Sequence, residues 1–74
     1  MFKIVGQRGC SYCEMALTTL KNRDLTYQYR MLNPQMKRYF KRMGWTTVPQ
    51  IWHKGKHIGG FNELNKYLRE IDNA

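Results

Sequence analysis

Two cysteines separated by two residues are the side chains of this 74-residue chain best suited to chemistry: Cys10 and Cys13, in the string Cys-Ser-Tyr-Cys. The pair follows a strand-like run and opens a helix-like one, so we expect Cys10 at a helix N-terminus. Unpaired backbone N–H groups and the positive end of the helix dipole favour a thiolate there. Cys13 follows almost one turn later, near enough to close a small disulfide ring. The spacing predicts redox chemistry in which Cys10 attacks and Cys13 resolves.

Length and composition set the context for this pair. A chain of 74 residues accommodates one domain, 1–74, with one small core, and 42% hydrophobic residues indicate a folded protein. Two cysteines are too few for a disulfide-dense secreted scaffold, and no signal-peptide pattern or long apolar stretch is present. We therefore expect a cytoplasmic protein, in which a Cys-x-x-Cys pair is catalytic or metal-binding rather than structural.

The net charge of +8 is the strongest bias in the composition. The densest basic cluster falls at helical spacing opposite apolar residues, as expected for the solvated side of an amphipathic helix. This cluster comprises Lys37, Arg38, Lys41 and Arg42. The charge also raises the rate of encounter with an anionic substrate or an acidic partner. We expect no nucleic-acid or membrane partner.

The elements that position the cysteines follow from hydrophobic periodicity. Residues 2–5 form a short apolar run that predicts a buried strand, and Ser11–Asn22 carries one apolar face and predicts a helix that Ser11 could cap. Alternation over Thr26–Met31 predicts a second strand. Together these elements form a βαβ unit with parallel strands and a right-handed crossover.

The second half of the chain predicts four more elements. Pro34 suits the first turn of a helix that runs to about Met43 and stops at a glycine. Residues 50–53 and 56–58 flank a turn signal and predict a hairpin, and a closing helix follows the glycine pair at 59–60. The predicted order is βαβαββα, an α/β fold with a four-stranded mixed sheet and three helices.

Three strings give this layout a family resemblance. They are Cys-Ser-Tyr-Cys at 10–13, Thr-Thr-Val-Pro-Gln-Ile at 46–51, and His-Ile-Gly-Gly-Phe-Asn-Glu-Leu at 57–64. In this order and spacing they resemble the glutaredoxins, and most closely the small bacterial and phage-type dithiol members. The resemblance implies a minimal thioredoxin-like fold. It also implies a glutathione-dependent thiol–disulfide oxidoreductase that reduces protein disulfides and glutathionyl mixed disulfides.

The central string is expected to bind the cysteinyl part of glutathione. In the family the proline that corresponds to Pro49 is cis, which brings the backbone of Val48 beside the cysteine loop. The Val48 N–H and C=O then remain free to pair with the bound tripeptide like a strand. Thr47 and Tyr12 belong to the same implied groove. From the local sequence alone, the alternative is that Pro49 is simply the residue at which a strand begins.

The glycine pair Gly59-Gly60 is expected to receive the γ-glutamyl end of glutathione. Small residues permit close approach, and the first N–H groups of the closing helix, from Phe61, Asn62 and Glu63, suit a carboxylate. Members often carry Asp two or three residues after the second glycine, so here Glu63 is the candidate partner for the ammonium. A plain helix start capped by Asn62 is the alternative.

The cationic partner of the glycine carboxylate is expected at one of two positions. Many members place Lys three residues before the first cysteine, where this chain has Gln7 followed by Arg8. Arg8 is one candidate, and the alternative is that Arg8 is a solvent-exposed loop residue that does not contact the ligand. Lys41 lies near a helix position from which a polar or basic residue often reaches the same carboxylate in the family.

Glutathione is expected as a co-substrate, and no bound metal, flavin or other cofactor is expected. We expect a monomer. The resemblance also implies ribonucleotide reductase as a protein substrate. Thioredoxin reductase as the electron donor is an alternative. A second is an iron–sulfur carrier that acts as a dimer, because Ser11 in place of the usual proline resembles certain cluster-binding members. A third is a zinc-dependent nucleic-acid module that uses His53 and His57, but Cys13 and His53 enclose 39 residues, too many for a zinc finger.

Overall fold

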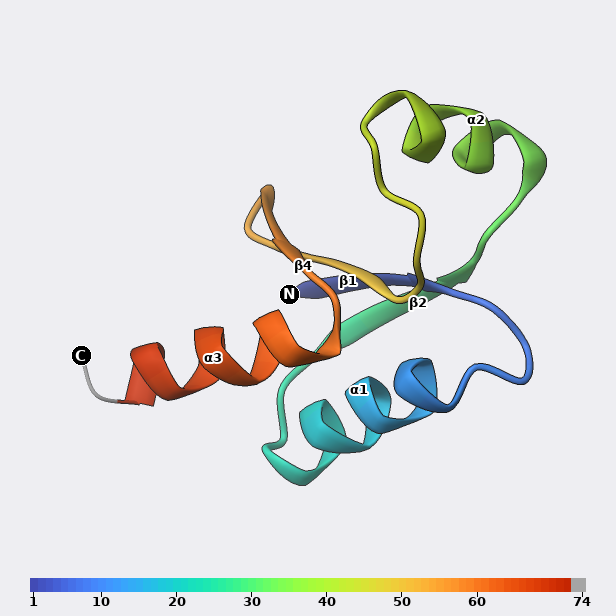
Figure 1. Ribbon diagram of the computed structural model, residues 1–74. Helices are drawn as coiled ribbons and strands as arrows, with labels where there is room; N and C mark the ends of the chain where they lie inside the picture. The colour runs from blue at the N-terminus through green and yellow to red at the C-terminus, as the bar shows by residue number, and fades with distance from the viewer. Residues whose placement is uncertain (73–74) are drawn as a thin grey trace.

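The computed structural model of the chain describes residues 1–72, which form a four-stranded sheet and three helices (Figure 1). Its elements follow the predicted order βαβαββα, and the predicted α/β fold class is confirmed. The strands are β1 (Phe2–Gly6), β2 (Tyr27–Met31), β3 (Gln50–His53) and β4 (Lys56–Gly59). Within residues 1–72 every helix is too short or too polar to cross a membrane.

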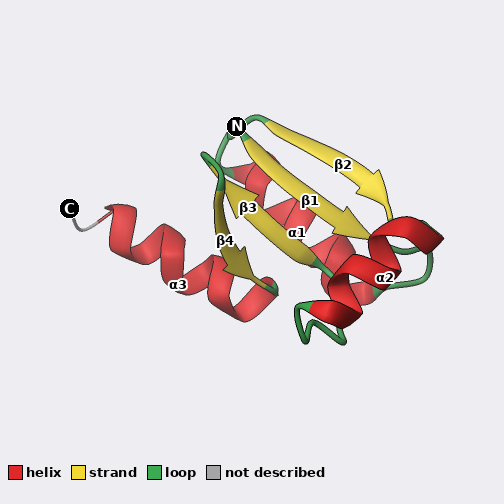
Figure 2. Cartoon of the chain, turned by 90° about the horizontal axis from the view of Figure 1, so that it is seen from above, coloured by secondary structure: helices red, strands yellow, loops and turns green. Residues whose placement is uncertain are grey.

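The sheet has the spatial order β2-β1-β3-β4 (Figure 2). β1 pairs parallel with β2, and the remaining pairs, β1 with β3 and β3 with β4, are antiparallel. A parallel pair requires a crossover connection, which α1 supplies between β1 and β2. The sheet is therefore mixed, and its central strand β1 leads directly into the cysteine loop.

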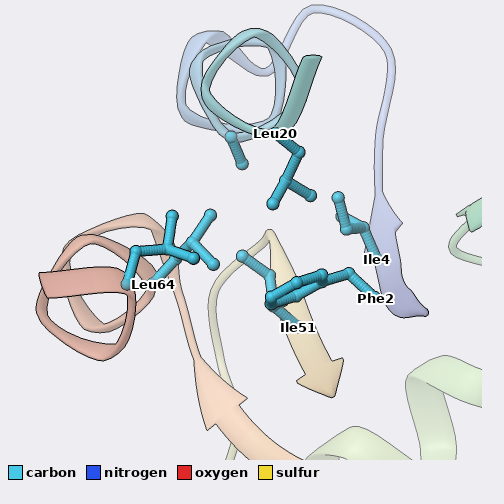
Figure 3. Packing of buried hydrophobic residues seen from close by; sticks show 7 residues of the cluster. Phe2, Ile4, Leu20, Ile51 and Leu64 are labelled. Carbon is cyan, nitrogen blue, oxygen red and sulfur yellow. The ribbon is translucent and has the colours of Figure 1, made fainter. Parts of the chain in front are cut away.

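The helices lie on both sides of the sheet. α1 (Ser11–Asn22) and α3 (Phe61–Asp72) cover one face, and α2 (Pro34–Arg42) lies on the opposite face (Figure 1). The main core lies between the sheet and the α1–α3 layer, where the labelled side chains point toward one another (Figure 3). Its buried members are Phe2, Ile4, Ala16, Leu20, Ile51, Leu64 and Leu68.

Aromatic rings hold α2 against its face of the sheet. Phe40 of α2 is buried, with its ring centroid 5.3 Å from that of Trp45 and 6.0 Å from that of Trp52. Trp45 also stacks on His57, with centroids 4.0 Å apart. Phe40 is the one buried residue of α2, because this helix covers the sheet through a few large rings. Tyr39 remains exposed on the same helix.

The start of α1 differs from the prediction. Cys10, not Ser11, is the N-cap residue, because the Cys10 sulfur accepts the backbone N–H of Cys13 at 3.1 Å. Ser11 is the first helical residue and is exposed. The other boundaries shift by at most one residue. β2, for example, begins after Thr26, although the Thr26 carbonyl still accepts the N–H of Phe2 at 3.0 Å.

Candidate active site

The two cysteines form a disulfide at the N-terminus of α1, with their Cα atoms 5.2 Å apart. Cys10 is half-buried, whereas Cys13 is completely buried against the core. The positive end of the α1 dipole and the Cys13 N–H both point at the Cys10 sulfur, and both stabilise negative charge there. The predicted placement of the pair is therefore observed, with Cys10 as the accessible sulfur.

The segment before β3 lies beside this sulfur. The carbonyl oxygen of Val48 is 3.8 Å from Cys10 Sγ, and the Val48–Pro49 peptide bond is cis, as the resemblance implies. Pro49 is buried and Val48 is half-buried. The backbone of Val48 is thus adjacent to the reactive pair.

Two hollows meet at Val48. One, the Tyr12 groove, has a volume of about 230 Å³ and collects most of the predicted binding residues. Its lining consists of Tyr12, Thr47, Val48, Pro49, Gly60, Phe61, Asn62 and Glu63. Residues from three segments far apart in sequence therefore form one groove beside Cys10.

The other hollow, the Lys41 cavity, has a volume of about 460 Å³ and lies between α2 and the loops around the cysteines. It shares Thr47 and Val48 with the Tyr12 groove. Six of its lining residues are not among the predicted binding residues: Gln7, Leu32, Lys37, Phe40, Trp45 and Thr46. Lys37 lies one helical turn before Lys41, and this i,i+4 spacing is the signal that would identify it.

Two predicted residues, Arg8 and Gly59, lie outside both hollows, and the alternative in which Asn62 caps the last helix is wrong. Arg8 is exposed in the loop before Cys10 and is not among the lining residues of either hollow. Gly59 ends β4 with a positive φ of 124° and lies under Glu63 rather than in the groove. Since α3 begins at Phe61, Asn62 belongs to its first turn and is not the cap.

Glu63 has a structural partner. Its carboxylate accepts the backbone N–H of Gly60 at 2.8 Å, which is the half of a capping box that the third helical residue supplies. The spacing from Gly60 to Glu63 is the sequence signal for this bond. The carboxylate still borders the Tyr12 groove, so negative charge lies next to the N-terminus of α3.

A buried amide connects the groove to the β3–β4 hairpin. Gln50, 5% exposed, donates its side-chain N–H to the Thr47 carbonyl at 2.8 Å. Its Oε1 therefore faces His57 Nε2 at 2.7 Å and accepts that N–H. Burial lowers the pKa of His57, which opposes a weaker upward effect of Glu63. A neutral His57 is therefore favoured in the folded protein.

The two histidines of the hairpin occupy different environments. His53 stacks on Phe2, with centroids 4.0 Å apart, and its Nδ1 lies 2.7 Å from the Tyr67 hydroxyl, whereas His57 stacks on Trp45. Both rings are thus engaged away from the cysteines. Within residues 1–72 no three His, Cys, Asp or Glu side chains are grouped as a metal site.

Comparison with known proteins identifies the family. The family model described as Glutaredoxin matches residues 2–58. The chain belongs to the glutaredoxin family. Glutaredoxins are thiol–disulfide oxidoreductases, and the cysteine pair of a dithiol member is present in Cys10 and Cys13. The chain is therefore a thiol–disulfide oxidoreductase.

Individual glutaredoxins extend the match beyond the family model. Glutaredoxin 3 of Escherichia coli is 32% identical over 65 residues, covering 84% of this chain and 78% of that protein. The structure of glutaredoxin 1 from Francisella tularensis, complexed with cacodylate, superposes with a TM-score of 0.82 at 28% identity, covering 99% and 96% of the two chains. The thioredoxin-like fold thus extends over nearly the whole chain.

One relative is a larger protein. The hybrid peroxiredoxin hyPrx5 of Haemophilus influenzae is 38% identical over 62 residues, which cover 81% of this chain. The chain spans only about a quarter of that protein, 26% of its length. The similarity therefore concerns one part of the hybrid protein.

Proposed function

We propose that this glutaredoxin reduces protein disulfides and glutathionyl mixed disulfides with electrons from glutathione. The observation that carries the proposal is the position of the Cys10 sulfur. It lies at the N-terminus of α1, 3.8 Å from the Val48 carbonyl oxygen, where the Tyr12 groove and the Lys41 cavity meet. A thiol-bearing peptide with two charged ends can extend from this point in both directions.

In the first step the Cys10 thiolate attacks a substrate disulfide. One S–S bond breaks, a Cys10 mixed disulfide forms, and the other sulfur leaves as a thiolate that takes up a proton. In the dithiol route Cys13 then loses its proton and displaces the substrate, which closes the Cys10–Cys13 disulfide. Two glutathione molecules reduce that disulfide and leave as oxidised glutathione, so the substrate gains two electrons and two protons.

In the monothiol route Cys10 instead takes the glutathionyl group of a glutathionylated substrate. A second glutathione attacks this mixed disulfide, releases the Cys10 thiolate and forms oxidised glutathione. Stabilisation of the thiolate favours this release, because a more stable thiolate is a better leaving group although it is a weaker nucleophile. The helix N-terminus therefore assists turnover mainly when Cys10 leaves.

Glutathione would bind along the two hollows. The Val48 N–H and C=O would pair with its cysteinyl backbone, between the ring of Tyr12 and Pro49. The γ-glutamyl carboxylate would accept the free N–H groups at the start of α3, next to Gly60. Lys41 would pair with the glycine carboxylate in the cavity that it lines. Arg8 would contribute positive charge beside Cys10 from the exposed loop.

The same proposal places the protein in a reducing compartment, the cytosol, where glutathione is abundant and a disulfide at the N-terminus of α1 is transient. A monomer suffices, because α1, α2, α3 and the loop at Val48 all come from one chain. The family resemblance supports ribonucleotide reductase as a protein substrate.

The test uses variants of each cysteine. Cys13→Ser is incubated with oxidised glutathione, and mass spectrometry is expected to find one glutathionyl group, on Cys10. Cys10→Ser is the matched control, and we expect it to form no glutathionyl adduct in the same time, since Cys13 is buried. Turnover of the wild-type protein is then measured with glutathione as the electron donor and, separately, with thioredoxin reductase as the electron donor. Absence of both the adduct and glutathione-linked turnover would refute the proposal.

A further inference from the structure

The charges of this protein are segregated in space. Residues 11–24 and 61–72, which contain α1, the turn after it and α3, carry four basic and five acidic side chains. The acidic ones are Glu14, Asp24, Glu63, Glu70 and Asp72. The remaining nine basic residues lie in the sheet, its loops and α2, where the sequence has no Asp or Glu. The basic excess therefore lies outside the α1–α3 layer, which is close to neutral, and four of the nine basic residues belong to α2.

The positive charge on α2 begins at the active site. Lys37 and Lys41 line the cavity that ends at Val48, whose carbonyl oxygen is 3.8 Å from Cys10 Sγ. Arg38 and Arg42 each follow one residue later, about 100° further round the helix, and are not among the lining residues of the cavity. All four side chains are exposed. They form one cationic stripe, which leads from the Cys10 sulfur outward over α2 and contains no acidic residue.

The amphipathic character of α2 does not require this arrangement. A solvated helix face is satisfied equally well by mixed Lys and Glu, which also form favourable i,i+4 pairs. Here the pairs Lys37–Lys41 and Arg38–Arg42 are both like-charged, an arrangement that destabilises an isolated helix. In contrast, α3 mixes acidic and basic residues, and Lys66 lies one turn before Glu70 as an oppositely charged i,i+4 pair. The stripe thus has an energetic cost that an anionic partner would offset.

We propose that the cationic stripe docks acidic segments of the disulfide-bearing proteins that this enzyme reduces. The inference rests on the proposed function and names the class of protein substrate. Acidic side chains that flank the substrate disulfide pair with Lys37 and Lys41 at the cavity and with Arg38 and Arg42 beyond it. Such complementarity mainly raises the association rate and orients the encounter, so that the substrate disulfide approaches Cys10.

A nucleic acid is the other anionic macromolecule that a basic surface can attract. Binding of single strands typically requires exposed rings on which bases stack. On the α2 side the large rings contact one another, since Trp45 stacks on His57 and lies edge-on to Phe40, to Trp52 and to Tyr39, the one exposed ring on α2. Trp45 and Trp52 are also partly buried. The stripe therefore fits an acidic protein segment better than a nucleic acid.

The test compares two peptides that contain the same disulfide, flanked either by Asp and Glu or by Asn and Gln. Their reduction by glutathione is followed with wild type and with two double variants of equal charge change. Arg38→Glu with Arg42→Glu reverses the outer part of the stripe. Lys66→Glu with Arg69→Glu makes the same change on α3. Turnover of the mixed disulfide of glutathione and 2-mercaptoethanol reports activity without docking.

We expect wild type to have about a tenfold higher kcat/KM for the acidic peptide at low salt, and the preference to fall as salt is raised. The Arg38/Arg42 variant loses most of this preference and keeps its turnover of the small mixed disulfide. The Lys66/Arg69 variant keeps both.

Three outcomes would overturn the inference while leaving the proposed function intact. They are equal rates for the two peptides, equal losses in the two double variants, and tighter binding of a single-stranded oligonucleotide than of the acidic peptide to wild type. Failure of wild type to reduce the small mixed disulfide would instead contradict the proposed function itself.

Discussion

His57 donates its Nε2–H to Oε1 of Gln50 at 2.7 Å, and this bond joins the β3–β4 hairpin to the active site. The other end of the Gln50 amide donates to the Thr47 carbonyl at 2.8 Å, one residue before Val48. Because Gln50 is 5% exposed, water cannot easily replace either partner. The position of the Thr47–Val48 backbone therefore depends on a buried side chain outside the groove.

Gln50→Ala should loosen this backbone. The substitution leaves the Thr47 carbonyl and His57 without their partners, and we expect a loss of about 1–3 kcal/mol in the free energy of unfolding, measured with urea. The KM for a glutathionylated substrate should rise. Gln28→Ala, at an exposed position of β2, is the control and should change stability by less than about 0.5 kcal/mol. Equal effects of the two substitutions would exclude this role for Gln50.

The pKa of His57 predicts a pH dependence of stability. Burial lowers this pKa below 6.5, its ordinary value, so the unfolded chain binds the proton more readily than the folded one. Stability is therefore full above pH 6.5 and falls as the pH drops from there through the lower pKa of the folded state. The pKa of His53 is also lowered, by burial first and then by nearby positive charge, and acts in the same direction.

The measurement is an NMR titration of both imidazoles, together with urea denaturation near neutral pH and about one unit below pH 6.5. We expect a His57 midpoint below 6.5 and a lower stability at the acidic pH. In His57→Gln the loss on acidification should be smaller than in wild type. A midpoint above 6.5 would mean that a negative charge, such as Glu63, outweighs burial.

Gly6 is expected to tolerate no side chain. A Cβ atom at this position would lie 2.9 Å from the sulfur of Cys13 and 2.9 Å from a ring carbon of Tyr29. Gly6→Ala therefore requires the buried Cys13 and the half-buried Tyr29 to move, at a cost of about 1–3 kcal/mol. Displacement of Cys13 should also slow the reduction of protein disulfides by the dithiol route more than that of glutathionylated substrates.

Gly44→Ala is the matched control for Gly6→Ala. Its φ is +79° and no atom lies within 4 Å of the added Cβ, so its cost is conformational, about 1–2 kcal/mol, without an effect on the cysteines. Urea denaturation of the reduced proteins and turnover of both substrate types separate the two cases. Identical ratios of the two activities in both variants would show that Gly6 does not act on Cys13.

The local features of the site could be predicted from sequence, because neighbouring residues determine them. The helix at 11–22, with Cys10 at its N-terminus, follows from one apolar face and the spacing of the cysteines. The N-cap was predicted wrongly because the sulfur of Cys10 accepts the hydrogen bond that a serine hydroxyl usually accepts at this position. Glu63 was expected to face the ligand, but its three-residue spacing from Gly60 also lets its carboxylate accept the Gly60 N–H, as the glutamate of a capping box does.

The long-range features could not be predicted in the same way. Gln50 joins Thr47 to His57 only because β4 folds back on β3, and Trp45 lines the Lys41 cavity only because α2 packs on that face of the sheet. A periodic pattern indicates which face of an element is apolar, but not which side chains from distant segments meet across a cavity. Predicting such contacts requires the packed structure.

The final prediction concerns the far ends of α1 and α3, which an ion pair joins. The Arg23 guanidinium donates two hydrogen bonds to the Asp72 carboxylate, at 3.0 and 2.6 Å, across 49 residues of sequence. The hydrogen bond from Arg23 lowers the pKa of Asp72 below its usual 3.8. A depressed carboxylate pKa contributes stability that is present above pH 3.8 and is lost as the pH falls through the folded-state value.

Asp72→Asn should remove this part of the acid-induced loss of stability, whereas Glu70→Gln, an exposed control on the same helix, should not. Because the two side chains are 37% and 50% exposed, added salt should weaken the effect. The measurement is a double-mutant cycle of Arg23→Gln and Asp72→Asn by urea denaturation, at low and high salt and on both sides of pH 3.8. Additivity of the two substitutions at neutral pH and low salt would show that the bidentate contact contributes nothing to the packing of α1 beside α3.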